Sequence, residues 1–262
     1  MSDWDSARYL QFVRQRTQPS IDLARRAHDW IEHPAAAIDL GCGPGNSTQV
    51  VQREFPDASV VGVDSSADML AAARRRCPDM EFLDVDLTGD LTRFDDAFDL
   101  VFSNACLQWI PDHAHVLPKV FRMLRPGGVL AVQIPVRNEQ VVQQVITETA
   151  RLPRWRECIV RERAWDGLDI DDYHDILSRM TADFELWQTT YCHRMPGVDA
   201  IVEWFSSSGL RPYLDQVPDD VRDDFRADVR NRLAEVFPVR ANGEVILRFP
   251  RLFMLAKRPL QA

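Results

Sequence analysis

A glycine-rich stretch near residue 40 constrains the fold of this chain more than any other part of its sequence. An apolar run leads into Gly41, Gly43 and Gly45 at alternate positions, and polar residues that open a helix follow. Glycine lets the backbone adopt conformations closed to other residues and pass very close to a ligand. The N-terminus of the next helix presents free N–H groups, so this turn is expected to hold a cofactor.

Apolar, strand-like runs alternate with helical segments on both sides of this turn. Strands are expected at 35–41, 58–64, 80–86, 97–103 and 129–134, with helices at 46–54, 66–76 and 112–124. This alternation predicts an α/β fold with a parallel, doubly wound sheet. Ligands of such sheets bind at the carboxyl ends of the strands.

The segments outside this core follow other patterns. Residues 1–34 are expected to form an N-terminal helical arm on the cofactor-binding core, 35–135. The segment 136–183 lacks the strand–helix alternation and is interpreted as an inserted helical lid. The rest, 184–262, should supply the last two strands, with a second helical insertion at 194–243.

Composition argues against several functions. Five cysteines without a CxxC pair disfavour a disulfide framework or a zinc site, and no metal is expected. The formal charge of −9 disfavours a nucleic-acid partner, which needs a broad basic surface. There is no apolar run of the roughly 20 residues that a spanning helix needs, and no export signal, so a cytoplasmic protein without membrane partners is expected.

Carboxylates at strand ends suggest what the cofactor carries. Asp64 ends the second strand, where it can accept hydrogen bonds from both ribose hydroxyls of an adenosine. Asp86, after the third strand, can reach an adenine amino group, and Leu87 offers an apolar face. The alternative for either Asp is a cap or turn. Asn46 stands where a dinucleotide fingerprint needs a small residue, which disfavours a nicotinamide oxidoreductase.

Four motifs together resemble the S-adenosylmethionine-dependent methyltransferases. They are Ile38-Asp39-Leu40-Gly41-Cys42-Gly43-Pro44-Gly45, Gly62-Val63-Asp64-Ser65-Ser66, Asp84-Val85-Asp86 and Leu124-Arg125-Pro126-Gly127-Gly128. The resemblance implies a Rossmann-like, seven-stranded sheet with the last strand antiparallel, and S-adenosylmethionine as methyl donor. It implies that Gly41 and Gly43 approach the methionine end of the donor and that Asp39 assists its ammonium. Asn104 would close the pocket, and Ser65 would join Asp64 in the cofactor site.

A closer resemblance covers nearly the whole chain. The segments that carry it are Met1-Ser2-Asp3-Trp4, Asn104-Ala105-Cys106-Leu107-Gln108-Trp109-Ile110-Pro111-Asp112-His113, Gly209-Leu210-Arg211-Pro212-Tyr213-Leu214 and Phe249-Pro250-Arg251-Leu252-Phe253. They are similar to the bacterial trans-aconitate 2-methyltransferase family. This implies a monomethyl ester of trans-aconitate, or of a closely related small polycarboxylate, as the product. Cys192 departs from the family pattern, which favours an aromatic residue there.

The acceptor of such a reaction needs no general base, because carboxyl groups ionise near pH ~4. The protein has to align the reactants, so its residues are expected to act by positioning only. Side chains suited to hold the acceptor are Gln108, Trp109, Tyr191, Arg211, Tyr213 and Arg251, with Tyr9 and Arg16 on the N-terminal arm. For each arginine the alternative is a structural ion pair, and for Trp109 it is core packing. His113 and His115 are expected to face solvent in a first helical turn.

Other functions stay open on the sequence alone. The same donor could serve a different acceptor, such as another organic or lipid-like acid or a nitrogen. The chain could also bind S-adenosylmethionine without turnover. A nucleic-acid methyltransferase is disfavoured by the acidity of the chain.

Overall fold

The computed structural model describes residues 13–136, 141–161, 167–206 and 208–260. The predictions for Met1–Trp4 and for Tyr9 lie outside these residues. The chain divides into two compact units. The first comprises Met1–Arg137, Trp165–Thr189 and Arg251–Ala262, and the second comprises Asn138–Ala164 and Thr190–Pro250.

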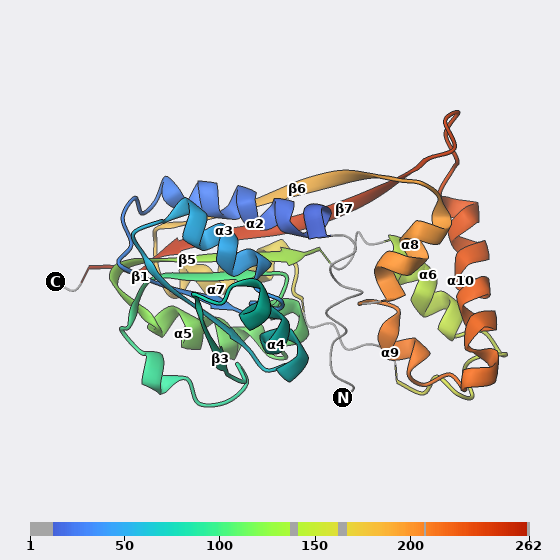
Figure 1. The fold of residues 1–262 in the computed structure, drawn as a ribbon, viewed down its shortest axis with the longest axis horizontal. Helices are drawn as coiled ribbons and strands as arrows, with labels where there is room; N and C mark the ends of the chain where they lie inside the picture. Colours follow the sequence, from blue (N-terminus) through green and yellow to red (C-terminus); the bar gives the residue numbers. More distant parts are fainter. Residues whose placement is uncertain (1–12, 137–140, 162–166, 207, 261–262) are drawn as a thin grey trace. The chain divides into compact units, whose positions relative to one another are not determined.

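A seven-stranded sheet runs in the order β3-β2-β1-β4-β5-β7-β6 (Figure 1). Its strands are β1 (Ala36–Leu40), β2 (Ser59–Asp64), β3 (Glu81–Asp84), β4 (Phe98–Asn104), β5 (Leu124–Pro135), β6 (Phe184–Met195) and β7 (Val245–Lys257). The pairs from β3 across to β5 are parallel, whereas β7 runs antiparallel to β5. The predicted doubly wound sheet with an antiparallel last strand is confirmed.

Local sequence sets the limits of the helices that connect these strands. The helices of the first unit are α2 (Val13–His28), α3 (Asn46–Glu54), α4 (Ala67–Arg76), α5 (His113–Arg122) and α7 (Ile170–Ser178). The side chain of Ser66 caps α4 by accepting a hydrogen bond from the Met69 N–H, at 3.3 Å. Asp112 caps α5 in the same way. Such caps satisfy N–H groups that a helix start leaves free.

The two faces of the sheet differ in polarity. Residues paired directly across strands share a face, and so do residues two apart along a strand. Asp39 is paired with Phe102, two residues before Asn104, and Asn104 is paired with Gln133. These polar residues therefore share the face on which α2 and α3 pack (Figure 1). The opposite face is apolar and buries residues such as Val132 against α5 and α7.

The second unit is mainly helical. Its helices are α6 (Val141–Ala150), α8 (Val198–Ser206), α9 (Arg211–Leu214) and α10 (Arg222–Val236). The sequence predicts a helix over 218–236 whose inward stripe is Val221, Phe225, Val229 and Leu233. The last three of these are fully buried in α10, whereas Val221 lies in a 3-10 turn before the helix and is only partly buried. Trp155 packs edge-on against Phe225, with ring centroids 5.2 Å apart, and its indole N–H donates to Asp228 at 2.8 Å.

The segment 136–183, predicted as one lid, is divided between the units, because 138–164 belongs to the second and α7 to the first. Its role as a lid stays a prediction. Within the described ranges, no helix is both long and apolar enough to cross a membrane.

Candidate functional site

The glycine-rich turn between β1 and α3 is held in place from two sides. Gly41 has a φ of +68°, and a Cβ there would lie 2.1 Å from the Cys106 sulfur, so only glycine fits. Gly43, with a φ of +54°, has no atom of a described residue within 4 Å of its Cβ position. The backbone beside Gly43 is therefore open to a ligand.

Asp39, at the end of β1, is a buried carboxylate with one unused oxygen. Its side chain is 0% exposed, and Oδ2 accepts hydrogen bonds from the Ser47 and Thr48 hydroxyls, both at 2.7 Å. Oδ1 has no hydrogen-bond partner in the described part of the chain. Burial raises the pKa of Asp39 to about 6, the charge of Asp64 adds to this rise, and the two hydroxyls oppose it. A cationic donor would satisfy Oδ1 and favour the ionised form.

Asp64 connects the glycine turn to the start of α4. Its Oδ2 accepts a hydrogen bond from the Gly43 N–H, and its Oδ1 accepts one from the Ser66 N–H, both at 2.9 Å. A carboxylate oxygen can accept more than one hydrogen bond, so ribose hydroxyls are suitable donors to this side chain. Ser65, the next residue, is exposed.

Asp86 and Leu87 follow β3 in different environments. Asp86 is exposed, and its Oδ1 accepts hydrogen bonds from the backbone and hydroxyl of Thr88, both at 2.8 Å, which lower the pKa of Asp86. Asp86 thus stabilises a local turn, which is the alternative to adenine binding that the sequence analysis left open for it. Leu87 is buried in the apolar core cluster, which also contains Val85 and Phe94.

The loop after β4 gathers buried polar groups. Asn104 is 8% exposed, and its Oδ1 has no partner among the residues described. Gln108 is buried as well: its Nε2 donates to the Ala105 carbonyl at 2.7 Å, while its Oε1 has no partner in the ranges that the structure describes. Ala105 itself has a φ of +55°, a left-handed conformation that is costly for alanine. Strain of this kind is typical of functional sites. Trp109 ends the same short loop and is half-buried.

Gln133, in β5, is a buried polar residue that sequence reasoning did not single out. It is 0% exposed, and neither its Nε2 nor its Oε1 has a hydrogen-bond partner in the described residues. The only signal in the sequence is one amide within the apolar run from Val129 to Ile134.

The predicted acceptor residues fall into two groups. Arg16 in α2 and Arg251 in β7 belong to the first unit, with the cofactor residues, and are 6% and 4% exposed. Tyr191, Arg211 and Tyr213 belong to the second unit.

Within the second unit, Tyr213 is buried and its hydroxyl lies 3.1 Å from the Thr147 hydroxyl. Arg211 lies 3.9 Å from the Asp215 carboxylate, a long contact. Tyr191 stacks on His193, with ring centroids 6.2 Å apart.

The prediction for His113 is wrong. Its ring is 2% exposed, with Nε2 at 2.8 Å from the Leu107 carbonyl and Nδ1 at 2.6 Å from the Tyr173 hydroxyl. Tyr173 lies 60 residues away in the sequence, so the local pattern of a first helical turn could not reveal this contact. His115, in contrast, is exposed and contacts Asp112.

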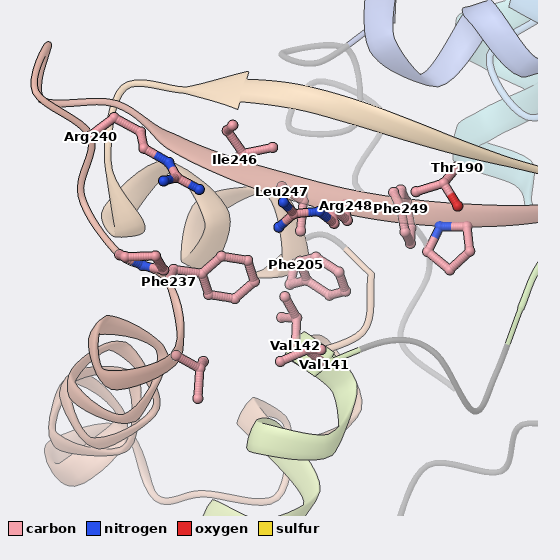
Figure 2. A pocket seen from close by; sticks show the side chains of 13 residues that line it. Val141, Val142, Thr190, Phe205, Phe237, Arg240, Ile246, Leu247, Arg248 and Phe249 are labelled. Atoms are coloured by element: carbon pink, nitrogen blue, oxygen red, sulfur yellow. The ribbon is translucent and has the colours of Figure 1, made fainter.

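A separate pocket of about 270 Å³ lies within the second unit. Figure 2 shows its apolar wall, which includes Phe205, Phe237 and Phe249, with Arg240 and Arg248 beside them. None of the predicted site residues lines it. In the described part of the chain, no group of three or more His, Cys, Asp or Glu residues is arranged to hold a metal ion.

Comparisons with known proteins match both the core that contains the glycine-rich turn and nearly the whole chain. Residues 37–128 match a family described as a methyltransferase domain. The trans-aconitate 2-methyltransferase of Acidovorax sp. (strain JS42) is 40% identical over 262 residues, which cover 98% of this chain and 99% of that protein. The protein of the same name from Escherichia coli (strain 55989 / EAEC) is 37% identical with the same coverage.

Solved structures show the same fold at low sequence identity. The YcgJ protein of Bacillus subtilis has a TM-score of 0.59 at 13% identity, covering 93% of this chain and 99% of that one. A Haemonchus contortus phosphoethanolamine N-methyltransferase 2, solved with S-adenosyl-L-methionine, has a TM-score of 0.55 at 18% identity, covering 92% and 52%.

The residues of the first unit fit S-adenosylmethionine. Asp39 and Asn104 each have a buried oxygen without a partner among the described residues, and such acceptors could hold an ammonium beside the Gly43 backbone. The carboxylate of Asp64 is placed at the end of β2, where hydroxyls of a ribose can donate to it. With relatives this similar over nearly its whole length, the chain belongs to the trans-aconitate 2-methyltransferase family of S-adenosylmethionine-dependent methyltransferases.

Proposed function

We propose that this enzyme transfers a methyl group to one carboxylate of trans-aconitate and forms a monomethyl ester. The observation that carries the proposal is the similarity to trans-aconitate 2-methyltransferases across 98% of the chain, which includes the second unit as well as the cofactor core. Arg251 lies in the same unit as the cofactor residues, and its planar guanidinium suits the carboxylates of an anionic acceptor.

The cofactor would be held by the turn and the strand ends. The proposed set is Asp39, Gly41, Gly43, Asp64, Ser65, Asp86, Leu87 and Asn104. S-adenosylmethionine, when bound, supplies a methyl group on a positively charged sulfur. Asp39 accepts hydrogen bonds from the ammonium of its methionine part, and Asp64 accepts them from the ribose.

The acceptor requires positioning and no activation. A carboxylate is ionised at neutral pH, so no side chain has to remove a proton. Holding the reacting groups in line can supply roughly 7–11 kcal/mol of the barrier. We propose that Gln108 and Trp109 orient the reacting carboxylate, while Arg16, Arg251 and Arg211 bind the others with Tyr9, Tyr191 and Tyr213. Arginine suits this role because its planar fork matches a carboxylate.

The activity is tested with purified protein, S-adenosylmethionine and a panel of small di- and tricarboxylates that includes trans-aconitate, citrate and isocitrate. Methyl esters are identified by mass spectrometry. We expect trans-aconitate to have the highest kcat/KM. Methylation of none of the panel would refute the proposed function.

The arginine roles are tested with Arg211→Leu and Arg251→Lys. Both variants should raise the KM for the acceptor and leave the Kd for S-adenosylhomocysteine unchanged. Arg248→Leu is the matched control, because Arg248 is an exposed arginine on the same strand as Arg251 and should be neutral. If the two variants lose cofactor affinity equally, the assignment of these arginines to the acceptor is wrong.

A further inference from the structure

Gln133 breaks the rule that a buried polar side chain has hydrogen-bond partners. It lies in β5, between β4 and β7 in the sheet, and is fully buried. Neither end of its amide is satisfied by any residue that the structure describes. Burying an amide without partners destabilises a protein, and an apolar side chain of similar shape would avoid the penalty.

The strands on either side of Gln133 explain why no residue in the described ranges satisfies its amide. Phe253, its register partner on β7, stacks on Trp187, with ring centroids 4.9 Å apart, and offers no polar group. Asn104, its partner on β4, has an amide oxygen that is itself without a partner. Gln133 and Asn104 thus present buried polar atoms side by side that a bound ligand could satisfy.

The register also places Gln133 between two proposed binding residues. On one side lies Asn104, assigned to the cofactor. On the other lies Arg251, assigned to the acceptor, which is two residues from Phe253 and therefore on the same face. All of these residues belong to the first unit. The Gln133 carbonyl also accepts the Ala105 N–H at 2.8 Å, which ties β5 to the strained loop that carries Gln108.

We propose that Gln133 binds the acceptor, its Nε2 donating a hydrogen bond to an oxygen of the carboxylate that receives the methyl group. This inference rests on the proposed function. A neutral amide suits that carboxylate because it orients the oxygen without cancelling its negative charge, as an arginine would. The unreactive carboxylates can be held by arginines without this drawback. Gln133 thus selects which carboxylate faces the donor.

The test uses Gln133→Met in the full-length enzyme, because methionine keeps the length of the side chain and removes both polar atoms. We expect kcat/KM for trans-aconitate to fall about 10- to 150-fold, the range for a lost hydrogen bond to a charged group. The Kd for S-adenosylhomocysteine should not change. The Tm should stay the same or rise, because the variant removes a buried amide that nothing satisfies.

A second variant gives a readout that a structural role would not produce. A buried carboxyl has a raised pKa, and its protonated form can donate a hydrogen bond as the amide does. The activity of Gln133→Glu relative to wild type should therefore increase as pH falls from about 8 to 6. Ile134→Met is the control for disturbance of the strand, because Ile134 is the next residue and packs in the core on the opposite face.

The outcomes separate this inference from the function on which it rests. If the wild type methylates no polycarboxylate, the proposed function fails and the inference with it. If the wild type is active and Gln133→Met keeps its kcat/KM, only the inference fails. A loss of S-adenosylhomocysteine affinity, or a marked fall in Tm that the Ile134→Met control does not share, would assign Gln133 to the cofactor site or to the fold and overturn the proposal.

Discussion

The protonation state of Asp39 should control cofactor affinity between pH 5 and 7. Its pKa of about 6 in the folded protein lies above the ordinary value of 3.8, chiefly because of burial. The folded protein therefore takes up a proton at a pH where the unfolded chain has none. The carboxylate is the form that can accept hydrogen bonds from an ammonium, so binding of the donor's methionine end should favour ionised Asp39.

The expected magnitude follows from the ionised fraction. With a pKa of about 6, roughly one Asp39 in eleven is ionised at pH 5 and ten in eleven at pH 7. If the bound ligand requires the ionised form, affinity should rise about tenfold over these two units. The ligand's own amino group, with a pKa near ~8, stays largely charged throughout.

The assay is calorimetric titration of S-adenosylhomocysteine, which has the same methionine end, at pH 5, 6 and 7. Asp39→Asn should bind it more weakly at pH 7 and with little pH dependence. Asp90→Asn is the control, since hydrogen bonds from Thr92 lower the pKa of Asp90, which stays ionised in this range and is not among the proposed cofactor residues. A flat wild-type profile, or an unchanged slope in Asp39→Asn, would refute the assignment of the ammonium to Asp39.

The same pKa makes a prediction for the stability of the ligand-free protein. Between pH 4 and 6 the folded state binds the extra proton, so stability should fall as pH rises through this range, by up to about 3 kcal/mol from this group. Asp39→Asn should remove that loss and unfold at higher urea concentration than the wild type at pH 7. A lower urea midpoint at pH 7 would show that the hydroxyl contacts of Asp39 outweigh its desolvation.

Three further predictions concern the turn, the core and the thiols. Gly43→Ala should abolish S-adenosylhomocysteine binding but cost only about 1–2 kcal/mol of stability, from the left-handed φ at this position. Gly41→Ala should lower the Tm much further, because its Cβ would collide with the Cys106 sulfur. Thermal melts measure the stabilities and calorimetry measures the binding. Tyr173→Phe should lower the free energy of unfolding by about 1–3 kcal/mol in urea, because a buried imidazole nitrogen loses its partner, and equal stability would refute this. Exposed Cys192 should react rapidly with a maleimide in the native protein, while Cys42, whose pKa is raised by burial, should react only on unfolding; mass-spectrometric mapping checks both.

The core of the fold could be predicted because its signals are local. A strand, a glycine turn and a helix start leave their pattern within a dozen residues, and Asp64 stands at a strand end that the alternation alone locates. The antiparallel last strand came from resemblance to a family, because nothing within β7 states its direction. The helix predicted at 218–236 begins at Arg222 instead, after a short 3-10 turn that includes Val221.

The rest depended on contacts between distant segments. His113 is buried because Tyr173 covers it, and Gln133 stands out only once the register shows that neither neighbouring strand offers it a partner. A single amide in an apolar strand looks, in one sequence, like any other tolerated polar residue. The tertiary contacts also place the acceptor arginines in two different units, and the composition of the chain gives no sign of this division.

The second unit is built from two separate pieces of the chain, 138–164 and 190–250, and this limits how the enzyme can be re-engineered. Helix α6, from the first piece, packs against α10, from the second, and Trp155 of the first piece rests on Phe225 of the second. A chimera that transplants only one piece from a relative would leave both helices without the surfaces they bury. Grafts meant to change acceptor preference therefore have to exchange 138–164 and 190–250 together.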